Sequence, residues 1–156
     1  MAGLVERDRW SVLLSAMDLP EFTWIEDYAC GVDLIDRQHR TLIDLTNLLR
    51  SIILREDAAS IAYCLVSLKA YVVYHFAYEE SWARAHGMPE AELARHARSH
   101  HAFGERVRLL ADTRPPADGA LRSLHGFLSS WLVKHIIQED RDMVRRLQAG
   151  HGADAG

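Results

Sequence analysis

Apolar residues recur every three or four positions along most of this chain, the spacing that gathers side chains on one face of an α-helix. The most regular stripe covers residues 61–86 and ends just before Gly87 and Pro89, which are typical of a helix end and of the start of the next helix. An earlier stripe covers residues 35 to about 54. The positions on these two stripes are Ile35, His39, Leu42, Leu49 and Ile53, then Ile61, Leu65, Leu68, Val72, His75, Glu79, Trp82 and His86.

Two further helices are predicted in the second half of the chain. One covers about residues 93–110 and ends before Pro115, and the other opens around Asp118 and runs through Asp140 toward Leu147. Their stripes are Leu93, His96, His100, Phe103, Val107 and Leu110, then Leu121, Leu124, Leu128, Trp131 and His135. Because short loops join only neighbouring antiparallel helices, we expect an all-α fold, an antiparallel up-down-up-down four-helix bundle with an N-terminal arm.

The chain divides into three parts on this reading. Residues 1–34 form an N-terminal arm, which Trp24 and Tyr28 are expected to hold against the bundle, and its first twenty or so residues could form a helix. Residues 35–148 form the four-helix bundle, and residues 149–156 form a flexible tail.

Composition limits the classes of function. With 156 residues, 49% of them hydrophobic, the chain can bury one core and is too short for two ordinary domains. The net charge of −4 argues against a nucleic-acid partner, because phosphate neutralisation requires a surplus of Lys and Arg. No signal peptide is recognisable and no apolar run approaches the roughly 20 residues that cross a bilayer, so we expect a soluble cytoplasmic protein with no membrane partner. Cys30 and Cys64 are expected to be free thiols.

Five of the six histidines on the apolar stripes carry the functional hypothesis. A single histidine on such a stripe is usually an ordinary core residue. Here, however, each of the four helices contributes at least one, and a glutamate joins them. Burying so many polar groups costs several kcal/mol unless they are satisfied, and metal ions satisfy them together. The set consists of His39, His75, Glu79, His96, His100 and His135.

The spacing and type of these residues narrow the metal. His75 and Glu79 are four residues apart, as are His96 and His100, so each pair projects from one helix face and can bind one ion or bridge two. Imidazole and carboxylate ligands without thiolate suit iron, manganese or zinc. A purely structural metal is an alternative.

Four motifs in order resemble those of the hemerythrin family, especially its bacterial single-domain members. Trp24 and Tyr28 precede GVDLIDRQH, which ends at His39. The later motifs are HFAYEE from His75, HARSHHAF from His96 and WLVKHIIQED, which ends at Asp140. The resemblance runs from about residue 24 to residue 147.

The resemblance implies a non-heme di-iron centre that binds O2 reversibly for storage, delivery or buffering. One iron would be held by His96, His100 and His135 and the other by His39 and His75, with Glu79 and Asp140 bridging two Fe2+/Fe3+ ions that share an oxo or hydroxo group. The iron with two histidines would be five-coordinate, and O2 would bind there. The residues expected to line the pocket are Phe76, Phe103, Trp131 and Ile136, for which ordinary core packing is an equal alternative.

The family pattern and simple spacing disagree about one ligand. Helical spacing pairs His135 with Glu139 at i+4, whereas the resemblance implies Asp140 at i+5, some 140° around an ideal helix. A local π-bulge would return the i+5 residue to the shared face, and such bulges are frequent at functional sites. We therefore expect Asp140 to be the ligand.

Two other functions use the same centre. It could act as a di-iron oxidase or peroxidase, or as a sensor of O2, nitric oxide or redox state whose iron moves the N-terminal arm. The histidine-rich ligand set favours binding over oxidation, so we expect a binding protein rather than an enzyme. The sequence names no protein partner and is compatible with a monomer.

Overall fold

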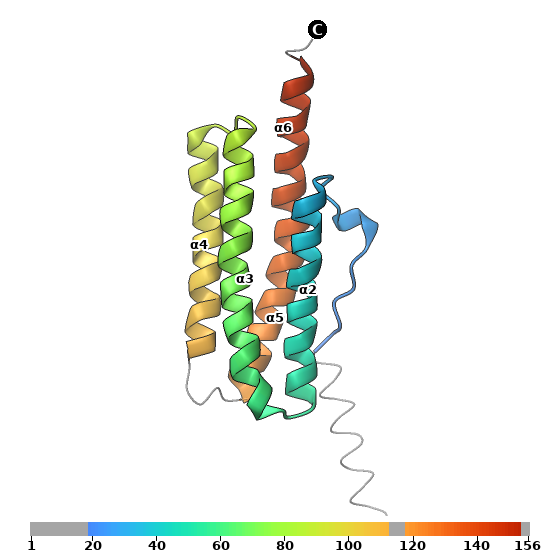
Figure 1. The fold of residues 1–156 in the computed structure, drawn as a ribbon, viewed down its shortest axis with the longest axis vertical. Helices are drawn as coiled ribbons and strands as arrows, with labels where there is room; N and C mark the ends of the chain where they lie inside the picture. The colour runs from blue at the N-terminus through green and yellow to red at the C-terminus, as the bar shows by residue number, and fades with distance from the viewer. Residues whose placement is uncertain (1–18, 113–117, 154–156) are drawn as a thin grey trace, which may run out of the picture.

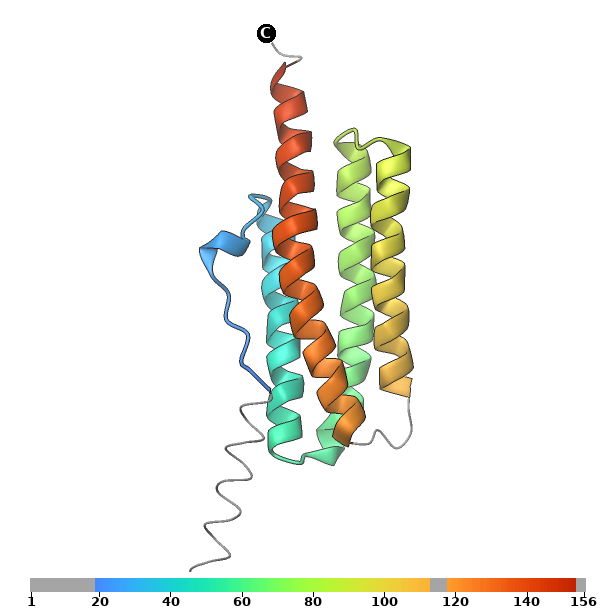
Figure 2. The same cartoon turned by 180° about the vertical axis from the view of Figure 1, so that it is seen from behind.

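The computed structural model describes residues 19–112 and 118–153, and within these ranges it contains helices and no strand. Four rods stand side by side (Figures 1 and 2). The first three are α2 (Asp33–Leu54), α3 (Ala58–Ala85) and α4 (Glu90–Asp112). The fourth is continuous and consists of α5 (Asp118–Lys134), the π-helical segment η2 (His135–Asp140) and α6 (Arg141–Ala153). The predicted all-α fold is confirmed.

The rods form a ring in chain order. α2 packs against α3 and α5, and α4 also packs against α3 and α5. Successive rods join at opposite ends of the bundle, so neighbours run antiparallel (Figure 1). This is the up-down-up-down arrangement that the short connections predict.

Local sequence explains where the rods begin and end. Asp57 caps α3, because its Oδ1 accepts a hydrogen bond from the Ser60 backbone N–H at 3.3 Å and its Oδ2 accepts one from the Ser60 hydroxyl at 2.6 Å. Gly87, with φ of 78°, makes the left-handed turn between α3 and α4, a conformation that costs glycine little. α2 begins at Asp33, slightly earlier than predicted, and α6 continues to Ala153, into the range expected as a flexible tail.

A polar layer divides the core into two apolar clusters. On each rod, the polar residue of this layer lies between one residue of the larger cluster and one of the smaller cluster. His39 lies between Leu42 and Ile35, and Glu79 lies between Phe76 and Ala83. The same order holds on α4 and along the fourth rod. Apolar packing above and below therefore fixes the height at which the polar side chains meet.

The N-terminal segment from Leu19 to Val32 runs alongside α2 and contains one short 3-10 helix, η1 (Glu26–Tyr28). Phe22 is buried, and its backbone exchanges two hydrogen bonds with the Asn47 side chain, at 2.7 and 2.9 Å. Trp24 lies under the Arg40 guanidinium at 4.5 Å. From Leu19 onward the segment is thus a packed arm. The helix expected in the first twenty residues falls almost wholly outside the described residues.

Asp36 ties the end of this arm to the start of α2. Its two carboxylate oxygens accept hydrogen bonds from the backbone N–H groups of Cys30 and Gly31, at 2.8 and 3.1 Å. The carboxylate therefore fixes the loop that leads into the first turn of the helix carrying His39.

By length and composition alone, α3 could cross a membrane, contrary to the expectation that no segment reaches that length. Within the described residues it is the one helix that does so, and 33% of its most apolar window is buried in the bundle. Its inner face carries His75 and Glu79 into the polar layer. Core helices of soluble proteins pass the same test of length and composition, so one such helix is weak evidence for a membrane span.

Candidate metal centre

All seven candidate residues from the sequence meet in the polar layer. None is more than 7% exposed: His39, His75, Glu79, His96, His100, His135 and Asp140. Their donor atoms form two groups, within each of which every atom lies within 4.8 Å of the others. Glu79 belongs to both groups. The arrangement therefore provides two adjacent positions for cations.

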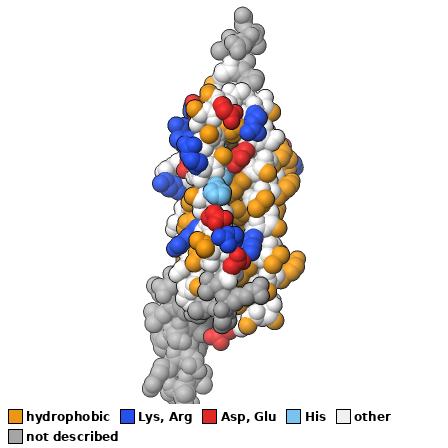
Figure 3. All heavy atoms as spheres, turned by 90° about the vertical axis from the view of Figure 1, so that its left-hand side faces the viewer, with side chains coloured by type: hydrophobic (Ala, Val, Ile, Leu, Met, Phe, Trp, Pro, Cys, Tyr) orange, Lys and Arg blue, Asp and Glu red, His pale blue; other side chains and the backbone are white. Residues whose placement is uncertain are grey.

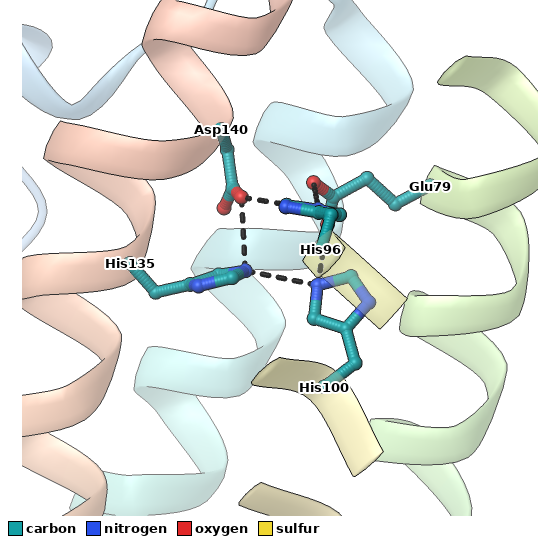
Figure 4. Close-up of side chains that lie close together, drawn as sticks. All are labelled: Glu79, His96, His100, His135 and Asp140. Carbon is teal, nitrogen blue, oxygen red and sulfur yellow. Dashed lines mark hydrogen bonds and ion pairs between the residues drawn. The ribbon is translucent and has the colours of Figure 1, made fainter. Parts of the chain in front are cut away.

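The larger group holds three histidines from α4 and the fourth rod. Figure 4 shows His96, His100 and His135 converging on the carboxylates of Glu79 and Asp140. The Nε2 atoms of His100 and His135 lie 2.9 Å apart. His96 Nε2 lies 3.0 Å from Glu79 Oε1. Three imidazoles and two carboxylates thus face one point.

The smaller group contains His39 from α2 and His75 from α3, together with Glu79. The two imidazole rings meet edge to face, with centroids 4.8 Å apart. His75 Nε2 lies 3.3 Å from Glu79 Oε2. This side of the layer offers one imidazole fewer than the other side.

Each carboxylate reaches both groups with a different oxygen. Asp140 places Oδ1 2.9 Å from His135 Nε2 and Oδ2 3.2 Å from His39 Nε2. Glu79 places Oε1 near His96 and Oε2 near His75. A carboxylate whose two oxygens face different groups has the geometry of a ligand that bridges two cations.

The π-helical segment η2 explains how Asp140 reaches this position. It spans His135 to Asp140, and its wider turn brings the residue at i+5 onto the face of residue i. Glu139, at i+4, instead lies 3.0 Å from the outer nitrogen, Nδ1, of His135. The expected π-bulge is confirmed.

Polar side chains that are not among the seven candidate ligands contact the outer nitrogen, Nδ1, of three imidazoles. One of these contacts is that of Glu139 with His135. Glu80 Oε1 lies 2.8 Å from Nδ1 of His100, and Gln38 Oε1 lies 3.0 Å from Nδ1 of His75. With an N–H on Nδ1, each imidazole presents the lone pair of Nε2 to the centre, which is the tautomer that metal binding needs. Gln38 was absent from the sequence analysis, because it stands beside the stripe and a lone glutamine carries no signal.

Aromatic rings cover the side of the layer that faces the larger cluster. Phe76 stacks on the His100 ring at 3.8 Å, and Trp131 stacks on the His135 ring at 4.0 Å. Phe103 packs against both aromatic residues, and Ile136 is 1% exposed. These four residues, predicted to line the pocket, therefore exclude water from one side of the histidines.

The layer is not satisfied by protein groups alone. The ring nitrogens of His39 and the carboxylate oxygens of Asp140 are buried and lack hydrogen-bond geometry, although His39 Nε2 and His135 Nε2 lie within ion-pair distance of Asp140. Such groups are costly to bury without partners. Two buried carboxylates, five imidazoles and unpaired lone pairs fit cations such as iron, which supply charge and accept those lone pairs.

The pKa values of the metal-free histidines reflect this burial. Burial, together with the nearby His39, lowers the pKa of His75 to about 3, and burial also lowers the pKa of His100. Both imidazoles are therefore neutral at pH 7, as a metal ligand must be. Burial also disfavours the charged form of His135, but the Asp140 carboxylate outweighs it and raises the pKa of His135 to about 10.

The three other histidines whose side chains the structure describes do not join the centre. His125 is buried in α5 without a hydrogen bond to either ring nitrogen, and His101 is exposed. His86 stacks on Trp82 at 4.0 Å and contacts the Trp82 carbonyl. In the sequence, His101 directly follows His100 and so points elsewhere, whereas His86 and His125 have no partner at the spacing of metal ligands.

Comparison with known proteins agrees with this centre. Residues 30–147 match the family model described as Hemerythrin HHE cation binding domain. A bacteriohemerythrin of Stenotrophomonas maltophilia is 31% identical over 129 residues, which cover 81% of this chain and 81% of that protein. The bacteriohemerythrin of Clostridium acetobutylicum is 26% identical over 129 residues, covering 79% of this chain and 98% of that protein. That of Methylococcus capsulatus is 28% identical over 124 residues, covering 76% and 91%.

Proposed function

Because the chain belongs to the hemerythrin family, we propose that it is a non-heme di-iron protein that binds O2 reversibly, for storage, delivery or buffering. One iron is held by His96, His100 and His135, and the other by His39 and His75. Glu79 and Asp140 bridge the two ions. The absence of a bridging or ligating thiol is in keeping with this centre, since Cys30 and Cys64 are free and buried elsewhere.

The observation that carries the proposal is the unequal number of histidines on the two sides of the bridging carboxylates. One side offers three imidazoles and the other offers two. If each carboxylate gives one oxygen to each ion, the side with His39 and His75 has one protein ligand fewer. An exogenous ligand can bind on that side without displacing a side chain.

When bound, the irons would supply the electrons for reversible O2 binding. The protein contributes the environment. His39 and His75 are at most 1% exposed, so bulk water has little access to their side of the layer. Phe76 and Trp131 cover the histidines of the other side with apolar rings. Because water supplies protons, its exclusion disfavours the proton-assisted transfer of electrons from the irons to O2.

The carboxylates outside the centre support the three-histidine side selectively. Glu80 and Glu139 contact the outer nitrogens of His100 and His135, whereas His75 contacts the neutral Gln38. Anionic partners make an imidazole a stronger donor. These carboxylates would therefore favour a higher iron charge on the side with three histidines.

A visible absorption spectrum tests the function. The iron-loaded chain is reduced without oxygen, exposed to air and then purged with argon, and the cycle is repeated. A band that appears with O2 and disappears on purging is the expected result, with one O2 taken up per chain. Irreversible oxidation on first exposure would contradict the proposal and would favour a sensor, while catalytic turnover of peroxide or a reductant well above that of free iron would favour an oxidase or peroxidase.

We expect the protein in the cytoplasm, in keeping with its free thiols.

A further inference from the structure

The outward face of α3 is as apolar as a buried surface. Tyr63, Val66, Val73 and Tyr74 expose 74%, 64%, 70% and 52% of their area. Figure 3, which looks onto the α4 side, shows a continuous band of hydrophobic side chains along its right-hand edge. A helix that is apolar on all sides is normally covered on all sides.

These residues follow the spacing of a helix-packing seam. We call the outward stripe of α3 the α3 seam; it consists of Ala59, Tyr63, Val66, Ala70, Val73 and Ala77, at steps of four and three. This is the spacing of the a and d positions in a coiled coil, which face another helix. All six residues are exposed, and the inner face of α3 already packs in the bundle. The seam therefore lacks a partner among the described residues.

Charge gives no basis for a charged partner. The only Lys, Arg, Asp or Glu from residue 58 to residue 78 is Lys69, and its Nζ is 2.7 Å from Asp112. A peptide or protein recognised through salt bridges would find no free charge on this part of α3. Beyond α3 residues 58–78, Glu80, Glu105 and Arg108 line the cavity beside Val73 and Ala77 and carry both signs of charge.

The order of large and small residues along the seam is self-complementary. Ala70 is at its centre, with Tyr63 seven residues before it and Ala77 seven residues after it. A twofold axis through Ala70 would pack two seams antiparallel and place the Tyr63 ring of each copy against Ala77 of the other. The alanines leave room for the tyrosines, and antiparallel helix dipoles attract. In a parallel pair, by contrast, the two Tyr63 rings would meet.

The exposed area matches what a dimer requires. The seam residues Tyr63, Val66 and Val73, together with Tyr74, which follows Val73 on the same outward face, expose on the order of 500 Å² per chain. Two copies would therefore cover about 1,000 Å² from these side chains alone, close to the lower limit of a specific interface even before the alanines are counted. A patch of about 500 Å² is in the range of the largest apolar patch of a typical protein surface, and such patches often mark an interaction site.

From these observations we infer that the α3 seam is the interface of a homodimer, whose occupant is the α3 seam of a second copy packed antiparallel about Ala70. The interface adjoins the metal centre. Val73 and Ala77 also line a cavity of about 540 Å³ between α3 and α4, which reaches Phe76 and His100. The second copy therefore lies over the mouth of this cavity.

Sedimentation equilibrium of the full-length protein tests the inference. Wild type is expected to be a dimer at tens of micromolar. Ala70→Lys brings two charges together at the twofold axis and is expected to raise the dimer dissociation constant at least about tenfold, giving a monomer. Ala102→Lys is the matched control, because Ala102 is an exposed alanine in the middle of α4, away from the seam, and this variant should remain a dimer. Equal helix content by circular dichroism and equal iron content in both variants and wild type would show that Ala70→Lys leaves the fold of each chain intact, whereas thermal stability also reflects the loss of the dimer.

Crosslinking gives a second readout that does not depend on disruption. Cys30 and Cys64 are buried, so Ala70→Cys adds a single accessible thiol. In the predicted dimer the two introduced thiols meet at the axis and form a disulfide on mild oxidation, while Ala102→Cys stays uncrosslinked. A monomeric wild type at 100 micromolar, or a dimer unaffected by Ala70→Lys, would overturn the inference. Binding of monomers to phosphatidylcholine vesicles that is lost in Ala70→Lys would overturn it as well, and would make the seam a lipid surface.

Discussion

His135 and Asp140 are five residues apart, yet Nε2 of the histidine lies 2.9 Å from Oδ1 of the aspartate. In a regular α-helix the two side chains would point in directions some 140° apart. The π-helical turn between them removes this difference and leaves Glu139 on the outer nitrogen of the same ring. One imidazole is thus held between an inner and an outer carboxylate.

Substitution separates the roles of these two carboxylates. Asp140→Ala removes the carboxylate proposed to bridge the two irons and should leave the purified protein with clearly less than two irons per chain. Glu139→Ala removes only an outer contact of His135 and should keep both. Iron is measured by mass spectrometry against protein concentration. The opposite pattern, with iron lost in Glu139→Ala and kept in Asp140→Ala, would make Glu139 the ligand.

Deleting one residue tests the π-helical turn itself. Gln138 is exposed, and its deletion would convert η2 to a regular α-helix with Asp140 at i+4 from His135. Residues of α6 keep their orientation, since a π-bulge equals a one-residue insertion in an α-helix. The deletion variant should bind two irons and unfold within a few degrees of wild type. Inserting an alanine after Gln138 instead moves Asp140 and Met143 off the inner face, and iron should be lost. Equal iron content in the two variants would argue against this role of η2.

Glu80 should strengthen metal binding without being a ligand. It lies 2.8 Å from Nδ1 of His100, and Glu80→Gln keeps an acceptor there but removes its charge. Loss of such an outer partner typically costs about 10–100-fold in metal affinity. Competition with a chelator, using Co2+ as the probe, measures the change. Glu105→Gln, on the exposed side of α4, is the control and should bind as wild type does. An unchanged affinity in Glu80→Gln would show that the contact has no such effect.

The two thiols should be unreactive in the native protein. Burial raises the pKa of Cys64 to about 11, and burial also raises the pKa of Cys30, with Asp36 adding to the effect. At pH 8 the Cys64 thiolate fraction is about a hundredfold below that of an ordinary thiol. Between the ordinary thiol pKa and pH 11, the Cys64 thiol keeps its proton in the folded state and loses it in the unfolded chain. The free energy of unfolding therefore falls as the pH rises toward 11. Alkylation at pH 8, followed by mass spectrometry, should label both cysteines in urea and neither in buffer. Rapid native labelling would show that these parts of the structure open.

The sequence predicted most of this centre because ligands and core residues obey the same periodicity. His39, His75 and Glu79 stand on unbroken stripes, so any helix that buries the stripe also buries them. Asp140 differs, because its position depends on a local change of helix type that no stripe encodes. It was found through the family resemblance, and η2 supplies the physical reason.

Contacts between helices were less accessible to sequence analysis. Gln38 supports His75 across the boundary of α2 and α3, and its side chain is polar, common and off the stripe. The exposure of the α3 seam was also not predictable from the sequence. The helix has two apolar faces, and the sequence does not show which of them is buried. Which face points outward follows from the packing of α3 between α2 and α4.

Anomalous diffraction at the iron absorption edge, from crystals of the iron-loaded protein, tests the central claim most directly. Two iron peaks are predicted in the polar layer. One should contact His96, His100 and His135, the other His39 and His75, and both should contact Glu79 and Asp140. A single peak, or iron bound away from these side chains, would contradict the account.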